Sequence, residues 1–111
     1  MKLLYCLLLF LISFTVFSQT KILSWNLENF GQSKSEKTIL YIANLLRDYD
    51  LIAIQEVVAG YGGAQAVAKL ADELNRKGAK WDYVISDPTS SSAYKTERYA
   101  FIWKTNKLKK I

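Results

Sequence analysis

The chain has 111 residues, of which 50% are hydrophobic, 14% aromatic and 23% charged, and 15 basic against 10 acidic residues give it a net charge of +5. This composition is too apolar for a disordered chain, and the length fits one domain at most. One cysteine and no histidine exclude a Ser-His or Cys-His nucleophile pair and a Cys/His zinc cage, so we expect any metal to be held by oxygen.

The first 18 residues have the pattern of a secretory signal peptide. A cationic start precedes an apolar run at 3–17, broken only by a serine and a threonine, and we expect cleavage after Ser18. The run is shorter than the ~20 residues of a membrane span, although an uncleaved anchor or a buried helix remains an alternative. Cys6 lies inside the run, where a lipoprotein cysteine would not be. We therefore expect a secreted or periplasmic protein, 19–111, with no membrane association after cleavage and no disulfide.

The charge surplus of the remaining chain is mild. Losing Lys2 leaves 14 of the 15 basic residues against 10 acidic ones, and four lysines lie among the last eight residues. A cationic surplus suits a polyanionic partner, but such a cluster is also typical of a solvated strand end or loop.

The first part of the mature chain predicts a strand, a helix and a second strand. Residues 21–26 alternate between polar and apolar with the period of a strand. Ser33 and Glu36 form a capping box for a helix over 34–48, whose apolar residues recur at helical spacing. Residues 51–54 are an uninterrupted apolar run, as in a strand buried on both faces.

The second part predicts a helix and two more strands. Residues 59–63 are read as a flexible, glycine-rich connection before a helix whose apolar face falls at 67–74. A strand over 81–86, a loop over 87–93 and an interior strand over 98–104 follow. The expected order is therefore β-α-β-α-β-β.

Two polar side chains follow the first two strands at the positions where their apolar patterns end. A right-handed crossover makes these strands parallel, so Asn26 and Glu56 should emerge at the same edge of the sheet. A carboxylate holds Mg²⁺, and a neutral amide orients a phosphate without repelling it. The alternative is structural: Asn26 makes a turn and Glu56 caps the next segment.

Four segments together carry a resemblance to a known family. KILSWNLENFG (21–31), YDLIAIQEV (49–57), WDYVISDP (81–88) and SAYKTERYAFIWKTNK (92–107) resemble, in order and spacing, the deoxyribonuclease I branch of the endonuclease/exonuclease/phosphatase superfamily. The resemblance implies a partial four-layer α/β/β/α sandwich, with the first sheet and two helices present here. It also implies that 19–111 is the N-terminal portion of that domain.

The resemblance implies a role for four residues. Asn26 would position the scissile phosphate and help to bind metal, Glu56 would bind the metal, Tyr94 would contact the DNA groove, and Glu97 would orient a catalytic histidine. The implied reaction is Mg²⁺-assisted hydrolysis of DNA, with Ca²⁺ or Mn²⁺ as other possible ions. The alternatives to these functional roles are structural: Tyr94 is a loop aromatic that packs on the core, and Glu97 forms a surface ion pair with Arg98.

Several features depart from the family pattern. Val58 and Glu28 stand where the family has basic DNA contacts, and Thr96 is an extra residue. The family's two catalytic histidines and its Asp-x-Asn pair would follow Ile111, so we expect an N-terminal fragment or truncated product, inactive alone and poorly stable.

Three functions remain open at this point. The first is a secreted, metal-dependent endonuclease acting on DNA, expected to be a monomer. The second is a phosphatase or phospholipid phosphodiesterase of the same superfamily. The third is a non-enzymatic, truncated exported protein that binds polyanions through its lysines.

Overall fold

The computed structural model describes residues 2–13, 19–60, 62–89 and 96–111. From residue 22 onward the elements follow the predicted order β-α-β-α-β-β, so the α/β class is confirmed. The elements are α1 (Lys2–Ser13), β1 (Ile22–Phe30), α2 (Glu36–Leu46), β2 (Leu51–Val58), α3 (Gly63–Asn75), β3 (Trp81–Ile85) and β4 (Glu97–Lys104).

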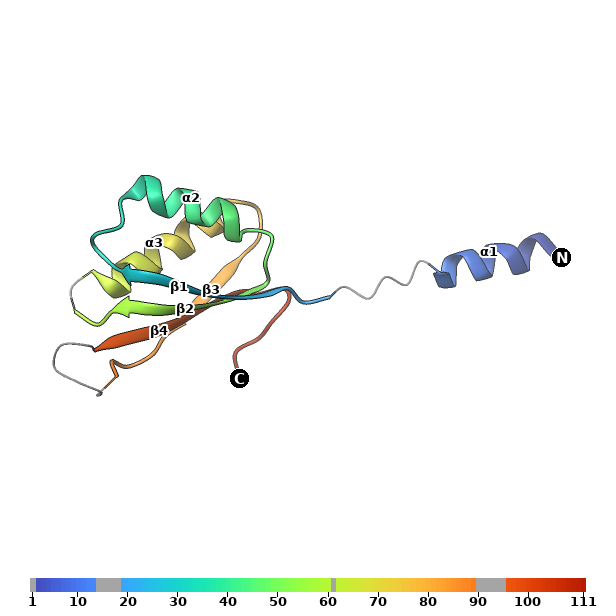
Figure 1. Ribbon diagram of the computed structural model, residues 1–111. Helices are drawn as coiled ribbons and strands as arrows, with labels where there is room; N and C mark the ends of the chain where they lie inside the picture. Colours follow the sequence, from blue (N-terminus) through green and yellow to red (C-terminus); the bar gives the residue numbers. More distant parts are fainter. Residues whose placement is uncertain (1, 14–18, 61, 90–95) are drawn as a thin grey trace.

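The four strands form one sheet in the order β1-β2-β4-β3. β1 and β2 are parallel, as the crossover predicts, whereas β4 is antiparallel to both of its neighbours. β4 is thus the interior strand that its apolar pattern indicated. Figure 1 shows α2 and α3 lying together over one face of this sheet.

The hydrophobic core lies between the two helices and the sheet. In the regular parts of β2 and β4, alternate residues enter it, Ile52 and Ile54 in one strand and Ala100 and Ile102 in the other, as the two-residue period requires. Its largest fully buried side chains are Phe30, Leu46, Ile52, Ile54, Val57, Val67, Leu70, Leu74 and Ile102. The opposite, open face of the sheet carries side chains that stay exposed, with Ile22 at 64%, Phe101 at 45% and Tyr99 at 40%.

Helix α2 begins two residues later than the capping box predicted. Its N-cap is Ser35, whose Oγ accepts a hydrogen bond from the Thr38 backbone N–H at 3.1 Å. The Ser33 hydroxyl instead donates to the Asn29 carbonyl at 3.3 Å. The Ser33 capping box is therefore wrong, because β1 continues to Phe30 and the turn that follows consumes the intervening residues.

The end of the sheet where β1 and β2 begin is tied together by Asp50, which is only 5% exposed. Its carboxylate accepts from the Lys21 backbone N–H at 2.8 Å and lies 3.6 Å from the Lys104 ammonium. The Lys21 hydrogen bond lowers the pKa of Asp50 most; burial opposes it, while Lys104 and Lys107 lower it further. The Lys104 ammonium also lies 5.3 Å from the Trp81 ring centroid.

Helix α1 lies apart from the sheet (Figure 1), and the side chains of Leu3 and Leu4 in its first turn are 79% and 69% exposed. In the part of the chain that the structure describes, no helix has both the length and the apolarity needed to cross a membrane. The predicted cleavage position after Ser18 lies outside the described residues.

Candidate functional site

The structure brings together the two residues that the strand pattern placed on one edge. The Asn26 side-chain amide donates a hydrogen bond to the Glu56 carboxylate, Nδ2 to Oε1, at 3.0 Å. Asn26 is exposed and Glu56 half-buried, so the pair faces solvent and is not sealed in the core. The predicted convergence of these two side chains is confirmed.

Glu56 reaches this position through a β-bulge that the sequence pattern did not reveal. Ile54 pairs with Ala100 and Val57 with Arg98, so two residues of β2, Gln55 and Glu56, lie opposite a single residue of β4. In a regular strand, Glu56 would share the helix-covered face with Ile54. The extra residue instead keeps Val57 in the core and leaves the Glu56 carboxylate on the open side.

The bulge places Glu56 in an uncommon backbone conformation. Its φ is +58°, in the left-handed region that costs an L-residue other than glycine or asparagine roughly 1–2 kcal/mol. Asn29 of β1 has φ +53°, where asparagine is tolerated, and the register of β1 against β2 shifts over the same stretch. Both strands therefore deviate from regular geometry where the candidate site lies.

A second polar pair adjoins the first on the open face. The Gln55 side-chain amide donates to the Ser24 hydroxyl at 2.8 Å, and Gln55 is the register partner of Asn26. Tyr99 is the residue of β4 opposite the bulge. Ser24, Gln55 and Tyr99 were not predicted to be near the site, although the alternation of Ser24 and Asn26 with apolar residues indicates a polar stripe along one face of β1.

Glu97 lies at the same edge of the sheet, because β4 begins where β2 ends. It pairs with Val58. The Glu97 backbone N–H donates to the Thr89 hydroxyl at 3.2 Å, and the Glu97 carbonyl accepts from the Thr89 backbone N–H at 2.9 Å. Neighbouring strand residues face opposite sides, and the Arg98 guanidinium donates to backbone carbonyls, so the ion-pair reading of Glu97 with Arg98 is not supported. Tyr94 lies outside the described residues.

The end of the glycine-rich connection, at Gly62 and Gly63, is closely packed, although a Cβ on Gly60 would meet open space. Gly62 caps α3 with φ +95°, and a Cβ there would lie 2.8 Å from the Gln32 backbone nitrogen. A Cβ on Gly63 would collide with the Val58 carbonyl oxygen, and one on Gly31 would lie 2.8 Å from the Val58 side chain. Glycine is needed here because the loops after β1 and β2 contact the end of β2 directly.

The donor set at Asn26 and Glu56 fits a divalent metal that remains open to substrate. Among the described residues, the Asn26 amide oxygen and the second carboxylate oxygen of Glu56 accept no hydrogen bond. Mg²⁺ is typically bound by one or two carboxylates, while waters and substrate phosphates fill the other positions. Within the described residues, no group of three or more His, Cys, Asp or Glu side chains could enclose an ion. The arrangement therefore suits a shared metal–phosphate site and does not form a closed cage.

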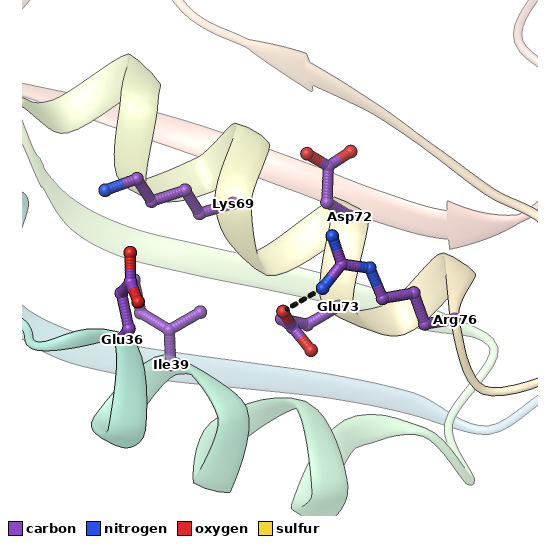
Figure 2. A pocket seen from close by; sticks show the side chains of 6 residues that line it. All are labelled: Glu36, Ile39, Lys69, Asp72, Glu73 and Arg76. Carbon is purple, nitrogen blue, oxygen red and sulfur yellow. Dashed lines mark hydrogen bonds and ion pairs between the residues drawn. The ribbon is translucent and has the colours of Figure 1, made fainter.

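A separate pocket of about 200 Å³ lies between α2 and α3 (Figure 2). Its lining carries both signs of charge: Glu36, Ile39, Lys69, Asp72, Glu73 and Arg76. The Arg76 guanidinium pairs with Glu73 at 2.9 Å. Three acidic residues face two basic ones, which leaves a single net negative charge, and none of the described acidic groups could enclose a metal ion.

Comparison with known proteins supports the resemblance, although no family model matches the chain. Deoxyribonuclease-1 of Bos taurus is 38% identical over 91 residues, covering 79% of this chain and 31% of the relative. Deoxyribonuclease-1 of Oryctolagus cuniculus is 34% identical over 110 residues, covering 96% and 38% respectively. A deoxyribonuclease of Thioalkalivibrio sp. (strain K90mix) is 30% identical over 99 residues, covering 88% and 26%.

A solved structure shares the fold. An endonuclease/exonuclease/phosphatase family protein from Leptotrichia buccalis C-1013-b matches with a TM-score of 0.56 at 19% identity, covering 77% of this chain and 37% of that chain. The chain thus spans about a third of the length of its relatives. The resemblance to the N-terminal part of the deoxyribonuclease I-like branch of the endonuclease/exonuclease/phosphatase superfamily is confirmed.

Proposed function

We propose that this chain supplies the metal-binding and phosphate-binding edge of a divalent-metal-dependent endonuclease that hydrolyses phosphodiester bonds in DNA. The observation that supports this most is the hydrogen bond of 3.0 Å between Asn26 and Glu56 on an exposed rim. The names of the relatives give the DNA substrate.

The two side chains have complementary parts in this proposal. Glu56 contributes the negative charge that holds Mg²⁺, or Ca²⁺ or Mn²⁺ in its place, and Asn26 keeps the carboxylate oriented through its amide. The amide oxygen of Asn26, which accepts no hydrogen bond from any described residue, is proposed as a further contact to the ion or its phosphate. The ion, when bound there, supplies positive charge to offset the charge that develops on the phosphate oxygens.

Proton transfer is not a role that these residues are suited to fill. The chain contains no histidine, and Glu97 is proposed only to orient such a base from the start of β4. We therefore expect the 111-residue chain to bind metal and phosphate without hydrolysing DNA at an enzymatic rate. Tyr94 is proposed as a contact to the DNA groove.

The N-terminal segment is proposed to direct export. Residues 1–18 would be removed as a signal peptide, leaving 19–111 secreted or periplasmic. The exposure of Leu3 and Leu4 supports this, because α1 contributes neither residue to the core. N-terminal mass spectrometry of the exported protein tests the cleavage position.

Metal binding to the purified chain tests the proposed site. In a Mn²⁺ titration followed by electron paramagnetic resonance, we expect Glu56→Gln to lose about tenfold or more in affinity. Asp72→Asn, which removes an exposed carboxylate from α3, is the matched control and should bind as the parent chain does. Equal affinities in the parent and Glu56→Gln chains would remove Glu56 from the site.

The substrate class is tested by thermodynamic linkage. If a ligand contacts the bound ion, it must strengthen the binding of Mn²⁺ by the same factor by which Mn²⁺ strengthens the binding of the ligand. We expect duplex DNA to do this and a simple phosphomonoester or a phospholipid head group not to. If a phosphomonoester or a phospholipid head group strengthened Mn²⁺ binding and duplex DNA did not, the phosphatase or phospholipid phosphodiesterase alternative would be favoured. The apolar Val58 at the end of β2 is the reason for testing this alternative.

A further inference from the structure

The left-handed backbone at Glu56 requires neighbouring contacts that hold it. A strained residue of this kind persists only where the surrounding structure fixes the chain on both sides of it. Before the bulge, β2 is fixed by regular pairing of Ile54 with Ala100. After the bulge, only Val57 and Val58 remain in the strand before the chain leaves the sheet.

Arg98 contacts the chain at the point where that pairing ends. Its Nε donates to the Ala59 carbonyl at 3.3 Å, and one of its terminal nitrogens donates to the Ser86 carbonyl at 3.4 Å. Arg98 is half-buried and is itself the register partner of Val57, the residue directly after Glu56. One guanidinium thus joins the segment after β2 to the segment after β3.

We propose that Arg98 is a positioning residue for the Glu56 carboxylate, holding the end of β2 so that the bulge cannot relax; this rests on the proposed metal site. The two carbonyls belong to residues that have left their strands, and a guanidinium fork can satisfy both at once. Without it, the segment after Glu56 is free to shift, and Glu56 can leave the left-handed region for a less costly conformation. The carboxylate would then lose its alignment with Asn26.

A metal-free nuclear magnetic resonance measurement tests this directly. The hydrogen bond to Glu56 should displace a side-chain amide proton of Asn26 from its free position, and Glu56→Ala defines the signal without the bond. We expect Arg98→Ala to move this signal to the Glu56→Ala position. Arg76→Ala is the matched control, because it removes a guanidinium that pairs with Glu73 on α3, and the Asn26 signal should stay in place.

Two further measurements separate positioning from general stability. Arg98→Lys keeps the charge but can reach only one carbonyl at a time, so it should move the Asn26 signal part of the way even if Arg98→Ala fails to fold. Among variants shown to be folded by circular dichroism, the Arg98 changes should weaken Mn²⁺ binding by about tenfold or more, as is usual for residues that orient a metal ligand. A purely structural role would lower resistance to urea and leave Mn²⁺ affinity unchanged.

The outcomes distinguish this proposal from the site itself. If the Asn26 signal does not move in folded Arg98→Lys and Arg98→Ala chains, the positioning role is overturned, regardless of the Mn²⁺ affinity of these variants. A parent chain that binds no Mn²⁺, while its Asn26 signal responds to Arg98, overturns the metal site and leaves the mechanical link between Arg98 and Glu56 standing.

Discussion

The bulge at Glu56 makes an unusual prediction about alanine and glycine. At an ordinary strand position, glycine is less stable than alanine by roughly 0.5–1 kcal/mol, because it has more conformational freedom to lose. At a φ of +58°, alanine also bears a left-handed penalty of roughly 1–2 kcal/mol that glycine escapes. Both substitutions remove the hydrogen bond with Asn26, so that loss cancels in the comparison.

We therefore expect Glu56→Gly to be more stable than Glu56→Ala by about 1 kcal/mol, the difference between these two effects. For a domain of this size, that corresponds to a midpoint of thermal unfolding higher by about 4–8 °C. Gln55, the preceding residue, is the control: there Gln55→Gly should be the less stable of the pair.

The assay is urea and thermal unfolding followed by circular dichroism on the four variants. Comparison within each pair removes the effect of losing the side chain and retains only the backbone term. If Glu56→Ala proved as stable as Glu56→Gly or more so, the left-handed strain at Glu56 would be refuted, and with it the reason for needing an anchor at Arg98.

Three further predictions concern the frame around the site. Asp50→Asn should lower the free energy of unfolding near neutral pH by about 1.5–3 kcal/mol, the value of a hydrogen bond to a charged group. Because folding lowers the pKa of Asp50, this stabilisation is present above a pH of about 3.8 and is lost as the pH falls through the native pKa, so the stabilities of the parent and the variant should converge in acid. A difference in stability that stayed constant with pH would contradict this. Gly63→Ala should be among the most damaging single-atom additions, since its Cβ collides with the Val58 carbonyl, and an unfolding midpoint equal to that of the parent would show that this loop is not tightly packed. Ser35→Ala should cost about 1 kcal/mol through loss of the N-cap while Ser33→Ala costs less, and urea titrations giving the reverse order would restore the capping box at Ser33.

Much of the fold follows from local patterns in the sequence. The alternation over 21–26 and the apolar run over 51–54 predicted neighbouring parallel strands, and the structure confirms them as parts of β1 and β2. The parallel topology predicted that Asn26 and Glu56 lie near the same edge of the sheet, but the bulge in β2 is also needed to bring the Glu56 carboxylate to the face that carries Asn26. The sequence could therefore predict the features that depend on the hydrophobic period and on the handedness of the crossover, namely the order of the elements and the direction of the first two strands.

The bulge, the left-handed Glu56 and the contacts of Arg98 emerged only from the tertiary structure. A strict two-residue period turns Glu56 toward the helices, and nothing between Ile54 and Val57 in the sequence marks the extra residue. Its position is decided by pairing with β4, more than forty residues further along the chain. Asp50 is similar, since its partners Lys21 and Lys104 become neighbours only when three strands align. Period and propensity act over a few residues, whereas register and close packing depend on segments that meet only after the chain has folded.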